Sequence, residues 1–351
     1  MSLKIKSDFI EKNLDFLKGS GDTNKGIEAL KYIEVIKKYL SEIEGSQDKI
    51  EDKFFSTFYS HLFQLNSKAL LIVDKDSRAK IKELFRERIK KYIFKSPLCR
   101  HGYTKPKGYP GDYKIIEAIY NGQPIASKNT IGFLFDQFFL QEEYVQAVRD
   151  RKDMMKKIFK SFIIQHKSKK MKILNIACGS CREIRELLNE DFSTRKAVDF
   201  VLIDQDKECL DYSKKHLSGC PANYKFHFLQ SNVFSFFRNG EFEKKFGKFD
   251  LIYSIGLADY LSDIILGDMI QKGFGRLTMD GKFIIAHKNV KKFDSISSDW
   301  VCDWSFIPRD KNDIKGLINR YLVPNTYNIR YEYLKSKLIF FFTLENAAKP
   351  C

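Results

Sequence analysis

The stretch Ile-Leu-Asn-Ile-Ala-Cys-Gly-Ser-Cys-Arg-Glu, residues 173–183, decides the fold. Its apolar first half predicts a buried strand, Gly179 predicts a tight turn, and the charged residues that follow predict the start of a helix. A second apolar segment, residues 198–203, ends in Asp204, whose carboxylate can accept hydrogen bonds from both hydroxyls of a ribose. Because parallel strands end at one edge of a sheet, the turn and Asp204 are expected to form one pocket for a nucleoside-like ligand.

The glycines of the turn indicate which ligand it receives. A dinucleotide site needs Gly-x-Gly-x-x-Gly so that backbone amides can approach a pyrophosphate, whereas these positions hold Ala177, Gly179 and Arg182. S-adenosylmethionine has no phosphates and needs only a close backbone approach to its methionine part and a carboxylate for its ribose. The turn therefore predicts this methyl donor rather than NAD. The predicted donor-binding residues here are Ala177, Cys178, Gly179, Ser180, Asp204 and Gln205.

Two later strand ends contribute further donor-binding candidates. Asn232 and Val233 follow a third strand, where a polar and an apolar residue can hold the adenine, with an ordinary turn as the alternative. Ser254 and Gly256 follow a fourth strand, at the edge where open α/β sheets bind their ligands. We therefore expect all four residues to line the donor pocket.

Several of these residues also have a purely structural interpretation. Arg149 or Arg151 can pair with the donor's carboxylate, or either can be solvated at the surface. Asp204 can instead cap the following helix. Residues 178–181 form a Cys-x-x-Cys pattern, which is found in redox pairs and zinc sites. No second such pair and no spaced histidine pair completes four ligands, so we expect no metal site.

The apolar periodicity divides the chain into three parts. Residues 1–95 have helical spacing and predict a helical bundle, and residues 96–170 predict an ordered loop over 96–110 followed by connecting helices. From residue 171 to 351 strands and helices alternate, which predicts parallel strands joined by crossover helices. The fold class is therefore α/β, with a mostly parallel sheet. The strands are expected at 172–177, 198–203, 224–229, 249–255 and 281–287, with a final antiparallel hairpin over 327–334 and 337–344.

Composition and charge limit the class of protein. The chain has 351 residues, is 43% hydrophobic and 14% aromatic, and contains no apolar run of signal-peptide or membrane-spanning length, so a soluble cytoplasmic protein is expected. Seven cysteines without regular spacing predict reduced thiols. The net charge of +16 is concentrated in residues 78–100 and 151–172. These lysine-rich segments predict solvated helix faces, with a binding surface for an anionic partner such as nucleic acid as the less favoured alternative.

A loop rich in glycine, proline and tyrosine, residues 102–113, precedes the α/β region. Its glycines and prolines set turns, and its tyrosines either fill the core or form a lid over the acceptor. We expect the lid, with Tyr103, Tyr109, Asp112 and Tyr113 as substrate-binding residues.

Four segments taken in order resemble one bacterial family. These are Gly108-Tyr109-Pro110-Gly111-Asp112-Tyr113, Ala177 to Glu183, Asp204-Gln205-Asp206, and Tyr253 to Leu261. They are similar to the extracellular-factor 3-hydroxypalmitic acid methyl ester biosynthesis proteins. The resemblance implies a class I Rossmann-like methyltransferase fold with a C-terminal antiparallel hairpin, S-adenosylmethionine as methyl donor, and methylation of a hydroxy fatty acid carboxyl group. Two further residues that suit the family complete the predicted substrate-binding set, Trp304 and Arg309.

The predicted activity is O-methylation of a small-molecule carboxylate to a methyl ester. A carboxylate is already an anion near neutral pH, so alignment and a dry site matter more than a general base. Asp259, Tyr260 and His287 lie at strand exits and are the predicted catalytic residues that orient the acceptor. The phenylalanine-rich stretches 54–63 and 133–139 either line an acyl groove or form core. The alternatives are an RNA or protein methyltransferase that uses the basic segments, and a non-catalytic S-adenosylmethionine-binding interaction protein.

Overall fold

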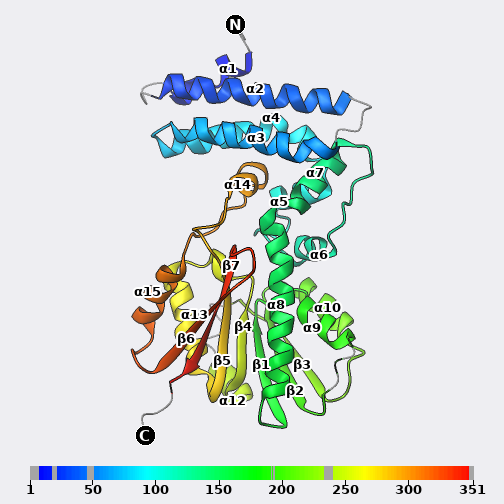
Figure 1. Ribbon diagram of the computed structural model, residues 1–351, viewed down its shortest axis with the longest axis vertical. Coiled ribbons are helices and arrows are strands. Elements are labelled where there is room, and N and C mark those ends of the chain that lie inside the picture. Colours follow the sequence, from blue (N-terminus) through cyan, green and yellow to red (C-terminus); the bar gives the residue numbers. More distant parts are fainter. Residues whose placement is uncertain are drawn as a thin grey trace. The chain divides into compact units, whose positions relative to one another are not determined.

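The computed structural model describes residues 8–17, 22–45, 51–190, 192, 194–232 and 240–347 (Figure 1). The chain forms two compact units. Unit 1 consists of residues 1–142 and 294–305, and unit 2 consists of residues 143–293 and 306–351. The first unit is therefore assembled from two separate parts of the sequence.

Unit 1 is helical, as the apolar spacing of its first 95 residues predicts. Three long helices pack against one another, α2, α3 and α4, and the shorter helices pack around them. The core is aromatic, because Phe54 and Phe58 each meet Phe135 edge to face and all three rings are buried. The helices of this unit are α1 (Asp8–Lys12), η1 (Asp15–Leu17), α2 (Thr23–Gly45), α3 (Glu51–Leu70), α4 (Lys75–Ile93), α5 (Pro97–Thr104), α6 (Tyr113–Asn121), α7 (Ile131–Gln141) and α14 (Ile296–Cys302).

Two helices of unit 1 differ from the sequence-based expectation. The segment 96–110 was expected to be a loop, but residues 97–104 form α5. Pro97 occupies the first turn, where a missing N–H costs nothing, and the side chain of Ser96 caps the helix by accepting from the amide of Cys99 at 2.9 Å. Helix α14 was not predicted either, although it holds Trp300, which is fully buried and meets Phe85 edge to face.

Unit 2 is built on a seven-stranded sheet with the order β3-β2-β1-β4-β5-β7-β6 (Figure 1). Strands β1 to β5 are parallel, while β7 runs antiparallel to both β5 and β6. This arrangement confirms the predicted α/β fold class with its C-terminal antiparallel hairpin. The strands are β1 (Lys170–Ile176), β2 (Ala197–Asp204), β3 (Tyr224–Gln230), β4 (Phe249–Ser254), β5 (Leu277–Lys288), β6 (Tyr327–Tyr333) and β7 (Ile339–Asn346).

Helices cover both faces of this sheet, so successive residues of its central strands are buried on opposite sides. Ile173 packs in the cluster beneath α8, α9 and α10, whereas Leu174 packs in the cluster beneath α12, α13 and α15. Such two-sided burial explains why these strands are almost continuously apolar. The alternation of strands and helices also predicts a helix over residues 234–245, which is observed from Gly240, while residues 233–239 lie outside the described residues. The helices of this unit are α8 (Glu143–Gln165), α9 (Arg182–Asn189), α10 (Lys207–His216), α12 (Gly240–Phe246), η2 (Ala258–Tyr260), α13 (Asp263–Gly275) and α15 (Lys311–Tyr321).

Candidate functional site

The turn between β1 and α9 has an alternating backbone conformation. Ala177, Gly179 and Cys181 have φ angles of 55°, 54° and 52°, in the left-handed region, while Cys178 and Ser180 between them do not. Left-handed geometry costs a non-glycine residue roughly 1–2 kcal/mol, so the turn is strained at two positions. A side-chain Cβ built on Gly179 would meet no atom within 4 Å. The turn thus presents bare backbone to open space, as a ligand that approaches the main chain requires.

Asp204, at the end of β2, connects that strand to the turn. Its carboxylate accepts from the backbone amide of Gly179 at 2.9 Å and from that of Asp206 at 3.0 Å. Burial raises the pKa of Asp204, and these backbone hydrogen bonds only partly offset the effect. The residue that caps α10 is Asp206, whose side chain accepts a hydrogen bond from the amide of Glu208. Asp204 therefore lies beside Gly179, where the sequence predicts it, and does not cap α10.

The end of β4 brings an arginine into the same region. The side chain of Ser254 donates to the carbonyl of Ile176 and ties β4 to β1. A Cβ on Gly256 would lie 3.6 Å from Nη2 of Arg151, a side chain of α8 that is only 6% exposed. Arg149, by contrast, is half-buried and its Nε donates to Gln146. Of the two arginines, the structure brings Arg151 to the predicted pocket edge.

Of the three remaining donor-binding candidates, the structure describes two, at the ends of β2 and β3. Gln205 and Asn232 are exposed, and the backbone carbonyl of Gln205 accepts a hydrogen bond from Gln230. Val233 lies outside the described residues. Their contact with a nucleoside stays a prediction.

The three residues predicted to orient the acceptor lie at or just after the ends of β4 and β5. Two of them, His287 and Asp259, form hydrogen bonds with backbone groups of Lys288. His287 is fully buried, its Nδ1–H donates to the carbonyl of Lys288 at 2.7 Å, and its Nε2 lies 3.3 Å from Nη1 of Arg309. The carboxylate of Asp259 accepts from the backbone amide of Lys288 at 2.8 Å. Tyr260 is half-buried, with its ring 5.4 Å from that of Phe306.

The electrostatics of this region favour an ionised aspartate. Burial raises the pKa of Asp259, but the basic groups of His287, Lys288 and Arg151 and the hydrogen bond from the amide of Lys288 outweigh this effect, and the net pKa is lowered. Burial lowers the pKa of His287. Arg309, predicted to bind substrate, forms an ion pair with Asp263 at 2.8 Å and donates to the carbonyl of Leu261 at 2.6 Å. These contacts connect the start of α13 to the segment that precedes α15.

The tyrosine-rich loop belongs to unit 1, where its aspartate has a clear local role. Asp112 is buried, caps α6 through the amides of Lys114 and Ile115, and lies 2.6 Å from Nε2 of His101. Tyr113 is 8% exposed, whereas Tyr109 is half-buried. The proposed lid would have to meet the turn of unit 2, and its position there stays a prediction.

Two further substrate-binding candidates are also in unit 1. The hydroxyl of Tyr103 lies 3.4 Å from the carboxylate of Glu87, and its ring meets Phe94 edge to face. Trp304 is 6% exposed, and its amide donates to the carbonyl of Ser298. The phenylalanines of 54–63 and 133–139 named above pack on each other as core, which favours the structural interpretation of these stretches.

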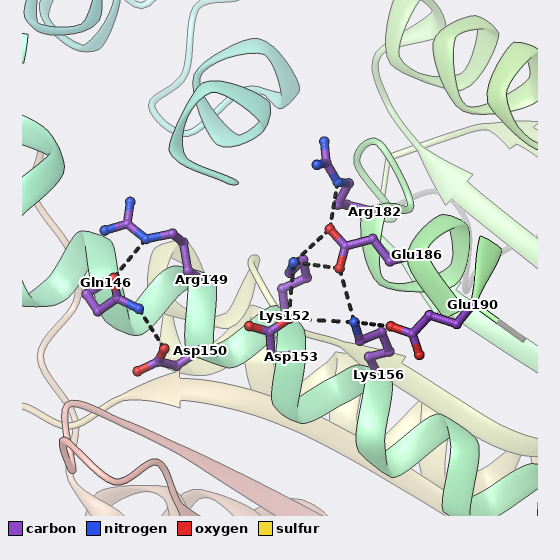
Figure 2. A network of polar contacts seen from close by, with 9 residues as sticks. All are labelled: Gln146, Arg149, Asp150, Lys152, Asp153, Lys156, Arg182, Glu186 and Glu190. Atoms are coloured by element: carbon purple, nitrogen blue, oxygen red, sulfur yellow. Dashed lines mark hydrogen bonds and ion pairs between the residues drawn. The ribbon is translucent and has the colours of Figure 1, made fainter. Parts of the chain in front are cut away.

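The basic segment 151–172 is partly neutralised within unit 2 (Figure 2). Nζ of Lys152 lies 2.6 Å from the carboxylate of Glu186, and Nζ of Lys156 lies 2.6 Å from that of Glu190. Arg182 pairs with Glu186 at 2.8 Å as well. The two lysine pairs join α8 to α9, whereas the Arg182 pair lies within α9, so part of the positive charge predicted for this segment serves the packing of two helices.

The structure also bears on the cysteines and on membrane insertion. The described cysteines are free thiols, and burial raises the pKa of Cys178 well above its usual value. No group of side chains suited to hold a metal ion occurs in the described part of the chain. Among the helices that the structure describes, none has both the length and the apolar character needed to span a membrane.

Two buried basic residues, Lys288 and Arg151, are not singled out by the sequence. The available signal for Lys288 was a charged residue two positions after the apolar run of β5, near the ligand-binding edge of the sheet. Arg151 was considered only together with its neighbour Arg149. Helical periodicity distinguishes them, since Arg151 continues the buried stripe formed by Ala147, Val148 and Met155.

No protein-family model matches the chain, and no curated protein matches it in sequence. Among solved structures, one described as a possible exported protein from Bordetella parapertussis is similar, with a TM-score of 0.58, 14% identity, and coverage of 86% of this chain and 98% of that chain. This likeness shows the fold alone.

Two solved methyltransferases resemble the chain more weakly. Magnesium protoporphyrin IX methyltransferase from Synechocystis, solved with bound S-adenosylmethionine, has 9% identity and a TM-score of 0.41, and covers 59% of this chain and 85% of that chain. An S-adenosylmethionine-dependent methyltransferase from Clostridium acetobutylicum has 13% identity and a TM-score of 0.40, and the match covers 57% of this chain and 92% of that chain. Scores below 0.5 do not establish a shared fold, so the fold class rests on the strand order and the antiparallel hairpin of unit 2.

Proposed function

We propose that unit 2 binds S-adenosylmethionine and transfers its methyl group to a carboxylate. The observation that carries the proposal is the hydrogen bond between the amide of Gly179 and the carboxylate of Asp204, at the shared edge of β1 and β2. It brings a bare, left-handed turn and a buried anion together on a sheet whose ligand edge lies at the carboxyl ends of its strands. Asp204 would receive the ribose hydroxyls, and Arg151 the donor's carboxylate.

The environment of the acceptor candidates supports a substrate that is itself the nucleophile. The side chains of His287 and Arg309 contact each other, and both donate hydrogen bonds to backbone carbonyls. These described residues therefore form a rigid, buried wall rather than an activated nucleophile. The bound donor supplies an electrophilic methyl group on a sulfonium. A carboxylate can attack it when held in line and shielded from water. The resemblance described above favours a hydroxy fatty acid as the acceptor.

The test has a binding arm and an activity arm. Calorimetric titration with S-adenosylhomocysteine is expected to show one site per chain. Methyl transfer from labelled S-adenosylmethionine is then measured with 3-hydroxy fatty acids of several lengths and with lipid, RNA and protein fractions of a lysate. Base-labile label in the lipid fraction supports the proposal. Absent donor binding, or label confined to RNA or protein, would overturn it.

A further inference from the structure

Lys288, the last residue of β5, has an unusual environment for a lysine. The residue is 3% exposed, and in the part of the chain that the structure describes its Nζ has no hydrogen-bond partner. Lysine is rarely buried to this extent without an anionic partner, because transfer of an unpaired ammonium out of water is strongly unfavourable. The side chain therefore has a function that simple packing by an apolar residue would not require.

Three aromatic rings surround the amine. Nζ lies 4.0 Å from the ring centroid of Tyr144 and 3.9 Å from that of Phe293, and it contacts the ring of Phe306. The three rings also meet one another edge to face. Aromatic faces attract a cation through their quadrupole, but they offer no strong acceptor for its three N–H groups. We call Tyr144, Phe293 and Phe306 the aromatic cage.

The carboxylate that acts on Lys288, that of Asp259, is already engaged. Asp259 accepts from the backbone amide of Lys288, lies 3.4 Å from Nδ1 of His287, and hydrogen-bonds the hydroxyl of Tyr144. Arg151 adds a second positive charge to the region. Burial lowers the pKa of Lys288 well below its usual value, which favours the uncharged amine. The cage thus holds an amine that can take up a proton, with an aromatic lining that stabilises the resulting cation.

We propose that Nζ of Lys288 receives the carboxyl group of the methyl acceptor and takes up its proton. This inference rests on the proposed function and assigns a substrate-binding group within the same site. The acid binds in its neutral form, which is the minor species in water near neutral pH. Its O–H bond breaks as the new N–H bond forms, and the ammonium remains in the aromatic cage beside the carboxylate. A carboxylate oxygen then bonds to the methyl carbon as the carbon–sulfur bond breaks. The proton leaves to solvent once the neutral ester departs.

Position on the sheet agrees with this role. Lys288 ends β5, next to β4, whose own end leads to Gly256 and Arg151. Two buried basic side chains from different elements therefore lie near the ligand edge, the guanidinium of Arg151 for the donor's carboxylate and the amine of Lys288 for the acceptor's carboxyl group. All three cage rings are half-buried, so an acyl chain can reach the amine by displacing rings rather than by opening the core.

Two substitutions separate anion binding from proton transfer. Lys288→Met keeps a long apolar side chain for the cage and removes the amine. Lys288→Arg restores a cation that pairs well with a carboxylate but does not give up its proton at ordinary pH. Lys282→Met is the matched control, because Lys282 lies in the same strand and forms its own half-buried ion pair with Glu345 at 3.0 Å.

The readouts are S-adenosylhomocysteine affinity, far-UV circular dichroism, and kcat and KM for 3-hydroxypalmitate. For Lys288→Met we expect an unchanged spectrum, donor affinity within about twofold, and a KM for the acid raised by about 10- to 100-fold. Lys288→Arg is expected to have a KM close to that of the wild type but a kcat below it. The Lys282→Met control is expected to match the wild type in every measurement.

The inference and the proposed function fail in distinguishable ways. A wild-type protein that binds no S-adenosylhomocysteine contradicts the proposed function. If the donor binds, acid binding is measured directly as a shift in melting temperature with 3-hydroxypalmitate added to the donor-product complex. The role of Lys288 is overturned if the acid does not shift the melting temperature of the wild type. It is also overturned if Lys288→Met shows the same shift and the same KM as the wild type. Full recovery of kcat in Lys288→Arg overturns the proton transfer.

Discussion

Asp204 accepts one hydrogen bond from the amide of Gly179 in the turn and one from the amide of Asp206, and it is the predicted ribose-binding residue, so its removal tests both roles. For Asp204→Ala we expect S-adenosylhomocysteine affinity to fall by about 10- to 150-fold, because charge-assisted hydrogen bonds contribute roughly 1.5–3 kcal/mol. Calorimetry measures the change. Asp206→Ala, which removes the side chain that caps α10, is the control, and equal affinity in both variants would exclude Asp204 from the ribose site.

The same aspartate gives a pH dependence with a definite sign. Burial raises its pKa in the folded protein, so it takes up a proton at a higher pH than an exposed aspartate does. Protonation removes the charge that accepts the ribose hydroxyls. Donor affinity should therefore be complete above this raised pKa and be lost as the pH falls through it. Titrations at a series of pH values check the loss, which should be absent in Asp204→Ala.

Gly179 is predicted to be essential for binding rather than for folding. Its neighbours Ala177 and Cys181 adopt similar φ angles with side chains present, so the backbone tolerates a side chain at moderate cost. What a valine would add is bulk in the open space above the turn. We expect Gly179→Val to keep its helix and strand content but to show no increase in melting temperature with S-adenosylhomocysteine. A ligand-induced increase equal to that of the wild type would contradict this.

Arg151 and Arg149 form a natural pair for comparison, because they are two residues apart on α8 and only Arg151 is buried at Gly256. Replacement of Arg151 by Met should weaken S-adenosylhomocysteine binding by about tenfold or more, through loss of a charge-assisted pair with the ligand's carboxylate. Arg149→Met should bind within about twofold of the wild type. The reverse order of affinities would assign the carboxylate to Arg149.

At the scale of single elements, the start of α15 offers a test of stability that is independent of the site. Asp310 and Asp313 form a capping box, and Asp310 also pairs with Lys291 at 2.6 Å. Asp310→Ala should destabilise the protein by about 0.5–2 kcal/mol, seen as a lower melting temperature. Hydrogen bonding to Lys291 lowers the pKa of Asp310 to about 2. The difference from wild type should thus persist above about pH 4 and shrink as the pH falls toward 2.

The elements that sequence alone predicted are those with local signals. Strands β1 and β2 are mainly apolar in their second halves and end at a turn or a carboxylate, so both their positions and their shared edge were predictable. The site was predictable only where a residue directly follows such a strand, as Asp204 does. The burial of Arg151 and Lys288 depends on how α8 packs on the sheet, and helix α5 depends on a cap that a proline-rich composition concealed.

At the scale of the whole molecule, helix α14 was the least predictable part of the fold, because its position depends on long-range packing. Helix α14 lies in a twelve-residue stretch between β5 and α15, where the alternation of strands and helices predicts only a connection. Its Trp300 donates through Nε1 to Asn66 at 3.0 Å, and Lys82 pairs with Asp299. These partners are more than 200 residues apart in the sequence, so no local pattern could indicate them.

This return of the chain into unit 1 determines how the protein can be dissected. A truncated form that begins at Glu143 would still carry residues 294–305, with the indole of Trp300 separated from Phe85 and Asn66. Such a fragment exposes a large apolar surface and invites aggregation. A recombinant form of either unit therefore needs its boundaries set at three positions in the chain, with residues 294–305 replaced by a short flexible linker in one fragment and rejoined to the helices in the other.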